Sequence, residues 1–405
     1  MEAFAYLIPY TQEWLNLIVR WLHVTTGIAW IGASFYFAWL DNAIRPPPPA
    51  SDLAKKGVAG ELWAVHGGGF YNPQKYLVAP AELPKELHWF KWEAYSTWLS
   101  GFALLIIVYY FDARAMLIDT SVADISSWQA ICISLGALAF GWVGYDLLCR
   151  SRLGEHDLWF GLVMFALIVA VAYALTKTLS GRAAYIHIGA MMGTMMAGNV
   201  LMLIIPGQRK MVNAMMAGQL PNPVHGQIAK QRSVHNNYFT LPVLFIMISN
   251  HYAMTYRQEW AWLVLAVIMA AGVFIRHFFN LRQRGRVVWR YLIISACLLL
   301  AVAVAIAPAP PGARAAAADP IAQFAKVQAI ITRRCVVCHA AHPTQAGITA
   351  APGGILLDSA ARIRQHAAQI YKQAVQLKAM PLGNLTNMAD AERGQIGAWF
   401  ETGAK

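Results

Sequence analysis

The sequence predicts an all-α protein in which a polytopic membrane helix bundle of about eight spans precedes a small soluble helical module. Hydrophobic residues make up 58% of the 405 residues and charged residues only 13%, whereas soluble domains carry roughly 25% charged residues. Eight apolar stretches are long enough for a bilayer, which a helix crosses in ~20 residues. After residue 307 the composition changes to that of a soluble chain. Disordered and collagen-like classes are excluded, and five cysteines are too few for a disulfide scaffold.

The eight expected spans follow one another from near the N-terminus to residue 307. We place them at 14–40, 93–111, 127–148, 157–176, 183–205, 236–254, 259–280 and 287–307. No cleavable signal peptide is expected before the first span, because the N-terminus lacks a basic region and the first apolar run is long and rich in Trp.

Lys and Arg are divided unequally between alternate connections, which predicts the orientation of the bundle. The connections after spans one, three, five and seven carry sixteen: Arg45, Lys55, Lys56, Lys75, Lys85, Lys91, Arg150, Arg152, Arg209, Lys210, Lys230, Arg232, Arg282, Arg284, Arg286 and Arg290. The other connections carry four, which are Arg114, Lys177, Arg182 and Arg257. We therefore expect the sixteen-charge side in the cytoplasm and both termini in the periplasm.

Residues 308–319 form a Pro/Ala segment typical of a linker. Residues 320–405 contain amphipathic helical patterns and no apolar run of spanning length. The helix before Cys335 carries Phe324 and the last helix carries Trp399, and we expect these two helices to pack together. The chain thus divides into a membrane domain (1–307), a linker (308–319) and a C-terminal module (320–405).

The C-terminal module contains Cys335-Val-Val-Cys338-His339, the spacing typical of covalent haem c attachment. The two thiols would form thioethers and His339 would ligate the iron. A zinc or redox CxxC is the alternative, but no second CxxC or His pair completes a zinc site. Met380 is the candidate second axial ligand, because a Met/His pair raises the haem potential, although a lone Met more often packs in a core. The module resembles a small class I cytochrome c.

Residues 320–405 contain nine Lys or Arg and four Asp or Glu. A basic surface near a haem edge suits docking to an acidic redox partner, and the alternative is a merely solvated surface. The remaining positive charge lies mainly on the cytoplasmic connections of the bundle. Neither the positive charge of the module nor that of the bundle indicates a nucleic acid partner.

Histidines inside expected spans are functional candidates, because ionisable groups in hydrocarbon are costly. His23, His187 and His251 fall in the periplasmic halves or ends of spans one, five and six. There they could ligate a haem b that relays electrons to the cytochrome module, with Gly27 leaving room for the porphyrin. The alternative is that the histidines bond neighbouring carbonyls and the small residues serve helix packing.

A second group of candidates lies on the cytoplasmic side. His66 is followed by Gly67, Gly68 and Gly69, whose backbone N–H groups could approach a flat anion closely. An esterase oxyanion loop is excluded because the chain has no GxSxG. The other candidates, at the cytoplasmic ends of spans six and seven, are Arg232, Asn236, Asn237, Arg276 and His277. The alternative for the arginines is that they only determine topology.

Four segments resemble the bacterial membrane-bound urate oxidases (urate hydroxylases): Trp21–Tyr36, His66–Tyr71, Asn199–Lys210 and Gln231–Phe239. In that family an eight-span domain precedes a C-terminal cytochrome c, the domain order expected here. The resemblance implies a multi-pass protein of the bacterial inner membrane that oxidises urate to 5-hydroxyisourate. Electrons would leave through haem c to an acceptor such as a terminal oxidase or a soluble cytochrome c.

Urate is a planar monoanion at neutral pH, so its pocket should offer a cation, an aromatic surface and amide partners. We expect substrate contacts from Arg232 or Arg276, Phe70 or Tyr71, and Asn236 and Asn237, with His66 and His277 as candidate general bases. The rival function is a non-catalytic electron-transfer or anchor subunit of a respiratory complex, in which the chemistry lies in a partner.

Overall fold

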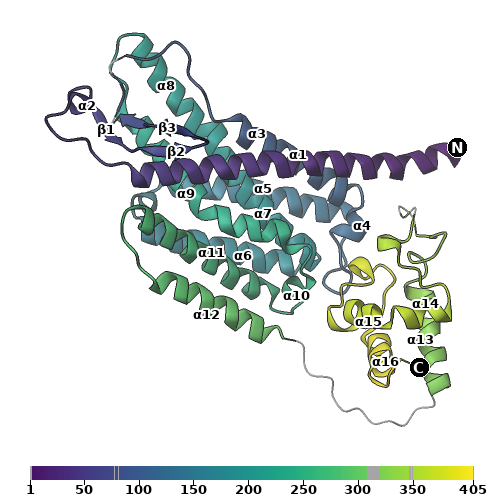
Figure 1. The fold of residues 1–405 in the computed structure, drawn as a ribbon. Helices are drawn as coiled ribbons and strands as arrows, with labels where there is room; N and C mark the ends of the chain where they lie inside the picture. Colours follow the sequence, from purple (N-terminus) through teal and green to yellow (C-terminus); the bar gives the residue numbers. More distant parts are fainter. Residues whose placement is uncertain are drawn as a thin grey trace.

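Long, roughly parallel helices fill residues 2–307, and a smaller helical module lies beside one end of them (Figure 1). This computed structural model describes residues 2–76, 78–80, 82–307, 320–345, 348 and 350–404. The expected linker, 308–319, falls outside the described residues. The predicted helical fold class is confirmed.

The bundle is built from helices that are each at least four turns long, some of them extended by a π-helical turn. They are α1 (Glu2–Ala43), α3 (Trp92–Leu104) continued by η1 (Leu105–Tyr110), α5 (Ser127–Arg150), α6 (Asp157–Thr176), α7 (Gly181–Gly198) continued by η3 (Asn199–Ile204) and α8 (Ile205–Met216), α9 (Pro223–Ser249), α11 (Ala261–Gln283) and α12 (Arg290–Ala305). Short turns connect them: α2 (Asp52–Lys55), α4 (Ala113–Met116), η2 (Arg152–Glu155) and α10 (Ala253–Tyr256).

Four of these helices are long and apolar enough to cross a membrane. They are Ser127–Arg150, Asp157–Thr176, the continuous Gly181–Met216 and Ala261–Gln283. The other four expected spans are also helical and correspond to α1, α3 with η1, α9 and α12. Span six differs most from its expected boundaries, because α9 begins at Pro223 and ends at Ser249 before a turn leads into α10.

Close packing of α5 on α7 forms the centre of the bundle. A Cβ at Gly141 would lie 2.2 Å from Cγ of Met191, so only glycine allows this approach. The thioether side chains of Met191, Met192 and Met195 are fully buried there. Flexible Met side chains fill irregular gaps between helices, which fits their concentration on α7.

The connection between α1 and α3 contains four short strands that the sequence did not predict. These are β1 (Val58–Glu61), β2 (Ala64–His66), β3 (Gly69–Tyr71) and β4 (Gln74–Tyr76), with β1 antiparallel to β4 and β2 antiparallel to β3. Gly67 and Gly68 have φ of +58° and +79° and form the two-residue turn between β2 and β3. The glycine run therefore makes a hairpin.

The C-terminal module is a small helical unit with its own apolar core. It contains α13 (Pro320–Arg334), η4 (Pro352–Gly354), α14 (Ala360–Gln365), α15 (Ala367–Ile370), η5 (Tyr371–Gln376), η6 (Leu382–Asn384) and α16 (Asp390–Glu401). As expected, α13 packs on α16, with the rings of Phe324 and Trp399 5.7 Å apart.

The two ends of the bundle differ in charge. The connection with the hairpins and the protruding α8 lie at one end, and the module lies at the other, beside α4 and α10 (Figure 1). The backbone N–H of Ser180 donates to the carbonyl of Leu117, so the connections before α5 and α7 meet at the module end. The module end is thus the end that carries four Lys or Arg, and the hairpin end carries sixteen.

Candidate functional site

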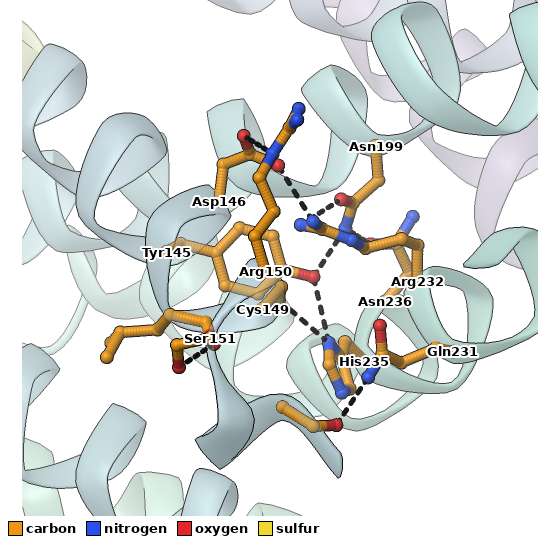
Figure 2. A network of polar contacts seen from close by, with 12 residues as sticks. Tyr145, Asp146, Cys149, Arg150, Ser151, Asn199, Gln231, Arg232, His235 and Asn236 are labelled. Atoms are coloured by element: carbon orange, nitrogen blue, oxygen red, sulfur yellow. Dashed lines mark hydrogen bonds and ion pairs between the residues drawn. The ribbon is translucent and has the colours of Figure 1, made fainter.

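A buried polar network crosses from α5 to α9 near the hairpin end of the bundle (Figure 2). Arg232 is 2% exposed and its Nη2 lies 2.7 Å from Oδ1 of Asp146. Its Nη1 donates to Oδ1 of Asn199, whose Nδ2 donates both to Tyr145 Oη and to Asn236 Oδ1, each at 2.8 Å. Removing either partner of such a buried ion pair leaves an uncompensated charge and is strongly destabilising.

His235 belongs to the same network. Its Nδ1 lies 2.9 Å from Tyr145 Oη and 3.7 Å from Cys149 Sγ (Figure 2). Phe160 stacks on the imidazole ring at 4.5 Å with an interplanar angle of 9°. The network fixes α9 against α5 and η3 through side chains from three elements. The π-helical turn that begins at Asn199 aims this amide at α9, as π-turns often do at functional sites.

A second cluster lies where α9 meets α11 and α1. Arg276 is 4% exposed. Its Nε donates to Oδ1 of Asn237, and Nδ2 of Asn237 donates in turn to Oδ1 of Asn280 at 3.0 Å. The guanidinium also lies 4.2 Å from the ring centroid of Phe35, a cation–π contact.

His277 neighbours Arg276 in sequence and faces tyrosines. Tyr238 Oη lies 2.7 Å from its Nδ1, and the ring of Tyr291 meets it edge-on at 4.6 Å. When Nδ1 carries the hydrogen and donates it to Tyr238 Oη, Nε2 is the basic nitrogen. Its ring is thus oriented by a partner, as a general base requires.

The two arginines share an electrostatic feature. Arg232 Nε and Arg276 Nη2 are buried donors without a hydrogen-bond partner in the described structure. Arg232 is neutralised by Asp146, but Arg276 has no ion pair with a carboxylate of the described residues. A buried cation without an anion is costly, so the Arg276 cluster is suited to an anionic ligand.

The hairpin candidates lie apart from both clusters. Phe70 is 77% exposed and Tyr71 is 53% exposed. In the register of the β2–β3 hairpin, His66 pairs with Gly69 across the turn. The described structure shows no hydrogen bond from residues 64–71 to the helices. The structure therefore places Arg232 and Asn236 in the first cluster and Asn237 and Arg276 in the second, beside His277. His66, Phe70 and Tyr71 lie outside both clusters.

The three histidines considered for a membrane haem lie in different surroundings. His187 is fully buried, with Nδ1 bonded to the carbonyl of Ala183 and Nε2 unpartnered. His23 is half-buried and its Nδ1 contacts the carbonyl of Thr97 on α3. The helix α3 packs against both α1, which carries His23, and α7, which carries His187. His251 is exposed beyond the end of α9. The structure does not bring these three into contact.

The small residues near these histidines differ in how closely other side chains approach them. A Cβ added at Gly27 would lie an ordinary 3.9 Å from Cγ2 of Thr97, whereas one added at Gly198 would lie 2.5 Å from the ring of Trp142. Such close approaches are typical of membrane helices. A haem b held by two of these histidines stays a prediction.

The residues of the CxxCH motif fit a covalent haem c. His339 Nδ1 lies 2.9 Å from the carbonyl of Ile355, which fixes the ring and leaves Nε2 for a metal. Burial raises the pKa of the Cys335 thiol to about 12, and burial also raises that of Cys338. Met380 is half-buried on the loop before η6.

A buried arginine holds the Met380 loop in place. Arg393 of α16 is 6% exposed. Its Nη1 donates to the carbonyl of Met380 at 2.7 Å and to the carbonyl of Ala374. Met380 N–H donates to the carbonyl of Gln373 at 3.1 Å. The backbone that carries the sulfur is thereby anchored at both its N–H and its carbonyl.

Several network residues were not singled out from the sequence: Tyr145, Asp146, Cys149, Asn199 and Tyr238. Asp146 carried a usable signal, because an acidic residue inside an apolar span is costly and by default functional. Tyr145 and Asn199 had no recognisable signal in the sequence, because each acquires its role from a contact with another helix.

Comparison with known proteins gives one family. Residues 9–307 match the family model described as urate oxidase N-terminal. No curated protein and no solved structure matches the chain. The match covers both polar clusters and all the helices of the bundle except residues 2–8 of α1.

Proposed function

Because this chain belongs to the urate oxidase N-terminal family, we propose that it is a membrane-bound enzyme that oxidises urate to 5-hydroxyisourate and passes the electrons to a covalent haem c. The balanced half-reaction is urate plus water giving 5-hydroxyisourate, two protons and two electrons. Each transfer to haem c carries one electron, so a downstream one-electron acceptor must reoxidise the haem between two transfers.

The observation that carries the urate site is the buried Arg276, which has an unpartnered Nη2 and no carboxylate partner in the described structure. The urate monoanion would supply the missing acceptor and the missing negative charge. Asn237 and Asn280 provide amide groups beside the guanidinium. The ring of Phe35, which the guanidinium of Arg276 contacts, provides an aromatic surface beside these groups.

His277 is the proposed general base. It follows Arg276 on α11 and its ring is oriented by Tyr238. It would accept a proton from urate or from the attacking water as the electrons leave. The Arg232–Asp146 network, on the α5 side of α9, holds the helix that presents Asn237.

Haem c would be held by Cys335 and Cys338 through thioethers and by His339 and Met380 at the iron. It supplies a one-electron acceptor that can be reoxidised from outside. Support comes from the orientation of His339 by Ile355 and from the anchoring of the Met380 loop by Arg393. No electron is routed through a haem b, and a pyridine haemochrome assay should therefore show only c-type haem.

We propose eight spans, with the hairpin end in the bacterial cytoplasm and the module in the periplasm. The module lies at the end of the bundle that carries four Lys or Arg, and the positive-inside rule assigns that end to the periplasm. Haem c is attached in that compartment, so the charge distribution and the CxxCH motif agree.

The decisive experiment adds urate anaerobically to the purified full chain and records the haem spectrum. Reduced c-type haem should appear, with 5-hydroxyisourate formed at one molecule per two haems reduced. A haem that dithionite reduces and urate leaves oxidised would refute the proposal. A requirement for a stoichiometric second protein would favour the rival, a non-catalytic subunit of a respiratory complex.

Arg276→Gln tests the urate site, with Arg284→Gln as its matched control. Both remove one cation from the same end of the bundle, but Arg284 is exposed and bonds only Asn42. Arg276→Gln should weaken urate binding by about 10- to 100-fold, the loss expected for a hydrogen bond to a charged group. Equal urate affinity in the two variants would place the substrate elsewhere.

A further inference from the structure

Among the described residues, a short stretch of the membrane domain lies against a short stretch of the C-terminal module. On the module side this stretch is the loop that follows Met380, including η6 and Asn387. On the membrane side it is the connection between η1 and α5, which contains α4. Thr120 Oγ1 donates to Oδ1 of Asn387 at 3.3 Å, and η6 lies against α4. We call this contact the Met-loop interface.

Gly383 is a point of close approach between the two parts. It is buried, its φ is +55°, and a Cβ built on it would lie 2.8 Å from the carbonyl oxygens of both Ala115 and Ile118. These obstacles are backbone atoms, so no side-chain rotation can relieve the overlap. The Met-loop interface therefore has no room for any side chain at this position.

Both sides of the interface are held rigidly. On the module side, Arg393 anchors the backbone of Met380. On the membrane side, Asp119 is 2% exposed, accepts from the N–H and hydroxyl of Ser121, and forms an ion pair with Arg257 at 3.1 Å. The turn that carries Ile118 and Thr120 is thereby tied to the end of α10.

The membrane side of the interface continues directly into the bundle. Tyr109, the penultimate residue of η1, precedes α4 by four residues and is 4% exposed. Its hydroxyl lies 3.5 Å from Oδ1 of Asn250 at the end of α9. The same segment of chain therefore carries Tyr109, which lies in the bundle core, and α4, which lies against the loop that follows Met380.

We propose that the Met-loop interface is the port through which electrons pass from the membrane domain to haem c, and that Gly383 is required for it. The port rests on the function proposed above. Urate is oxidised, haem c is reduced by one electron at a time through this face, and the downstream one-electron acceptor takes each electron from another face of the module.

Gly383→Ala tests the port, with Gly403→Ala as its matched control. Gly403 also lies in the module, has a φ of +95°, and has nothing within 4 Å of an added Cβ. The two variants share the backbone strain of a left-handed alanine, but only Gly383→Ala obstructs the interface. The rate of urate-driven haem reduction should fall by about tenfold in Gly383→Ala, the fold-change that ~1.4 kcal/mol of overpacking produces.

Two readouts separate this effect from a damaged module. Haem content and the rate of reduction by ascorbate, which reaches the haem from solution, should equal those of wild type in both variants. Urate-driven reduction that is as fast in Gly383→Ala as in Gly403→Ala would overturn the proposal.

A cross-link provides an independent test if Gly383→Ala does not fold. In the Thr120→Cys/Asn387→Cys variant, mild oxidation should form a disulfide across the interface, and the linked protein should reduce its haem with urate as fast as the single variants do. Failure to form the disulfide, or loss of urate-driven reduction on forming it, would refute the port. If urate does not reduce wild-type haem at all, the proposed function fails instead, and disulfide formation still tests the contact.

Discussion

His277 and His66 were equal candidates for the general base in the sequence, and single substitutions separate them. His277 lies in the Arg276 cluster with its ring held by Tyr238, whereas His66 lies on the exposed β2–β3 hairpin. His277→Ala should lower kcat for urate-driven haem reduction by about 10²- to 10⁴-fold, as loss of general base catalysis does. His66→Ala should retain wild-type kcat. Stopped-flow kinetics measures both, and the reverse ranking would move the chemistry to the hairpin.

At this scale the sequence identified charged and amide residues but not their partners. Arg232, Asn236, Asn237, Arg276 and His277 were predicted because polar residues at span ends are conspicuous against apolar surroundings. Their partners Tyr145 and Asn199 come from other helices. Helix-to-helix neighbours depend on packing, which hydropathy does not encode. The pairing of His23 with His187 was undetermined for the same reason.

Among helices, the contact of α5 with α7 depends on Gly141. Gly141→Ala would place a methyl group 2.2 Å from Met191 Cγ and should destabilise the bundle by ~1–3 kcal/mol through overpacking. Gly136→Ala is the matched control on the same helix, because nothing lies within 4 Å of its added Cβ. It should be neutral or stabilising by up to ~1 kcal/mol, the helix preference for Ala over Gly. Thermal unfolding in detergent compares the two, and equal midpoints would contradict the packing argument.

Glu392 ties α16 to α13 in the module and predicts a pH dependence. Burial alone would raise the pKa of its carboxyl group, but hydrogen bonds from the Ala389 N–H, Arg334 and Arg333 outweigh it and hold the pKa below its usual range. Its stabilising contribution is therefore complete above ~4.3, the unfolded value, and is lost as the pH falls through the lower folded pKa. Glu392→Gln should remove this dependence and cost ~1 kcal/mol, as loss of a helix cap does.

The unfolding midpoint of the module, followed by the haem spectrum between pH 3 and pH 7, measures the effect of Glu392. If the unfolding midpoint of wild type changes no more with pH than that of Glu392→Gln, the assigned role of the carboxylate is contradicted.

The hairpins show where element-scale prediction failed. The His66-Gly-Gly-Gly run was interpreted as a backbone that approaches a ligand, but Gly67 and Gly68 supply the two positive φ angles of a tight turn. Three-residue strands such as β2 and β3 are too short for a period-two pattern to be recognised. The helices were predicted well because their apolar runs exceed any plausible strand length.

For the whole molecule, the unequal charge of the two ends predicts its orientation in the membrane. A membrane-impermeant maleimide added to intact spheroplasts should label a cysteine placed at Thr402 in the module and leave one placed at Val65 in the hairpin unlabelled. Val65 is 68% exposed and lies at the sixteen-charge end. Labelling of Val65→Cys in intact spheroplasts would reverse the proposed topology.

The number of spans illustrates the limit of composition as a guide to the whole fold. Four helices have the length and hydropathy to cross a membrane, while α9 carries Arg232, Asn236 and Asn237 within the helix. A helix that contributes buried polar residues to a site loses hydropathy in proportion. The apolar content predicts that the bundle is helical. Hydropathy alone does not identify which of its helices cross the membrane.

The length of the continuous α7–η3–α8 helix has a consequence for how the substrate gains access. Its 36 residues extend roughly 54 Å at about 1.5 Å per residue, whereas the hydrocarbon layer is about 30 Å thick. Counted from Gly181, Asn199 lies roughly 27 Å along the axis. If Gly181 marks one boundary of the hydrocarbon, as the proposed topology has it, the Asn199 network would lie near the opposite boundary rather than in the middle of the lipid. A water-soluble purine anion, the proposed substrate, would then reach it without losing its hydration in hydrocarbon.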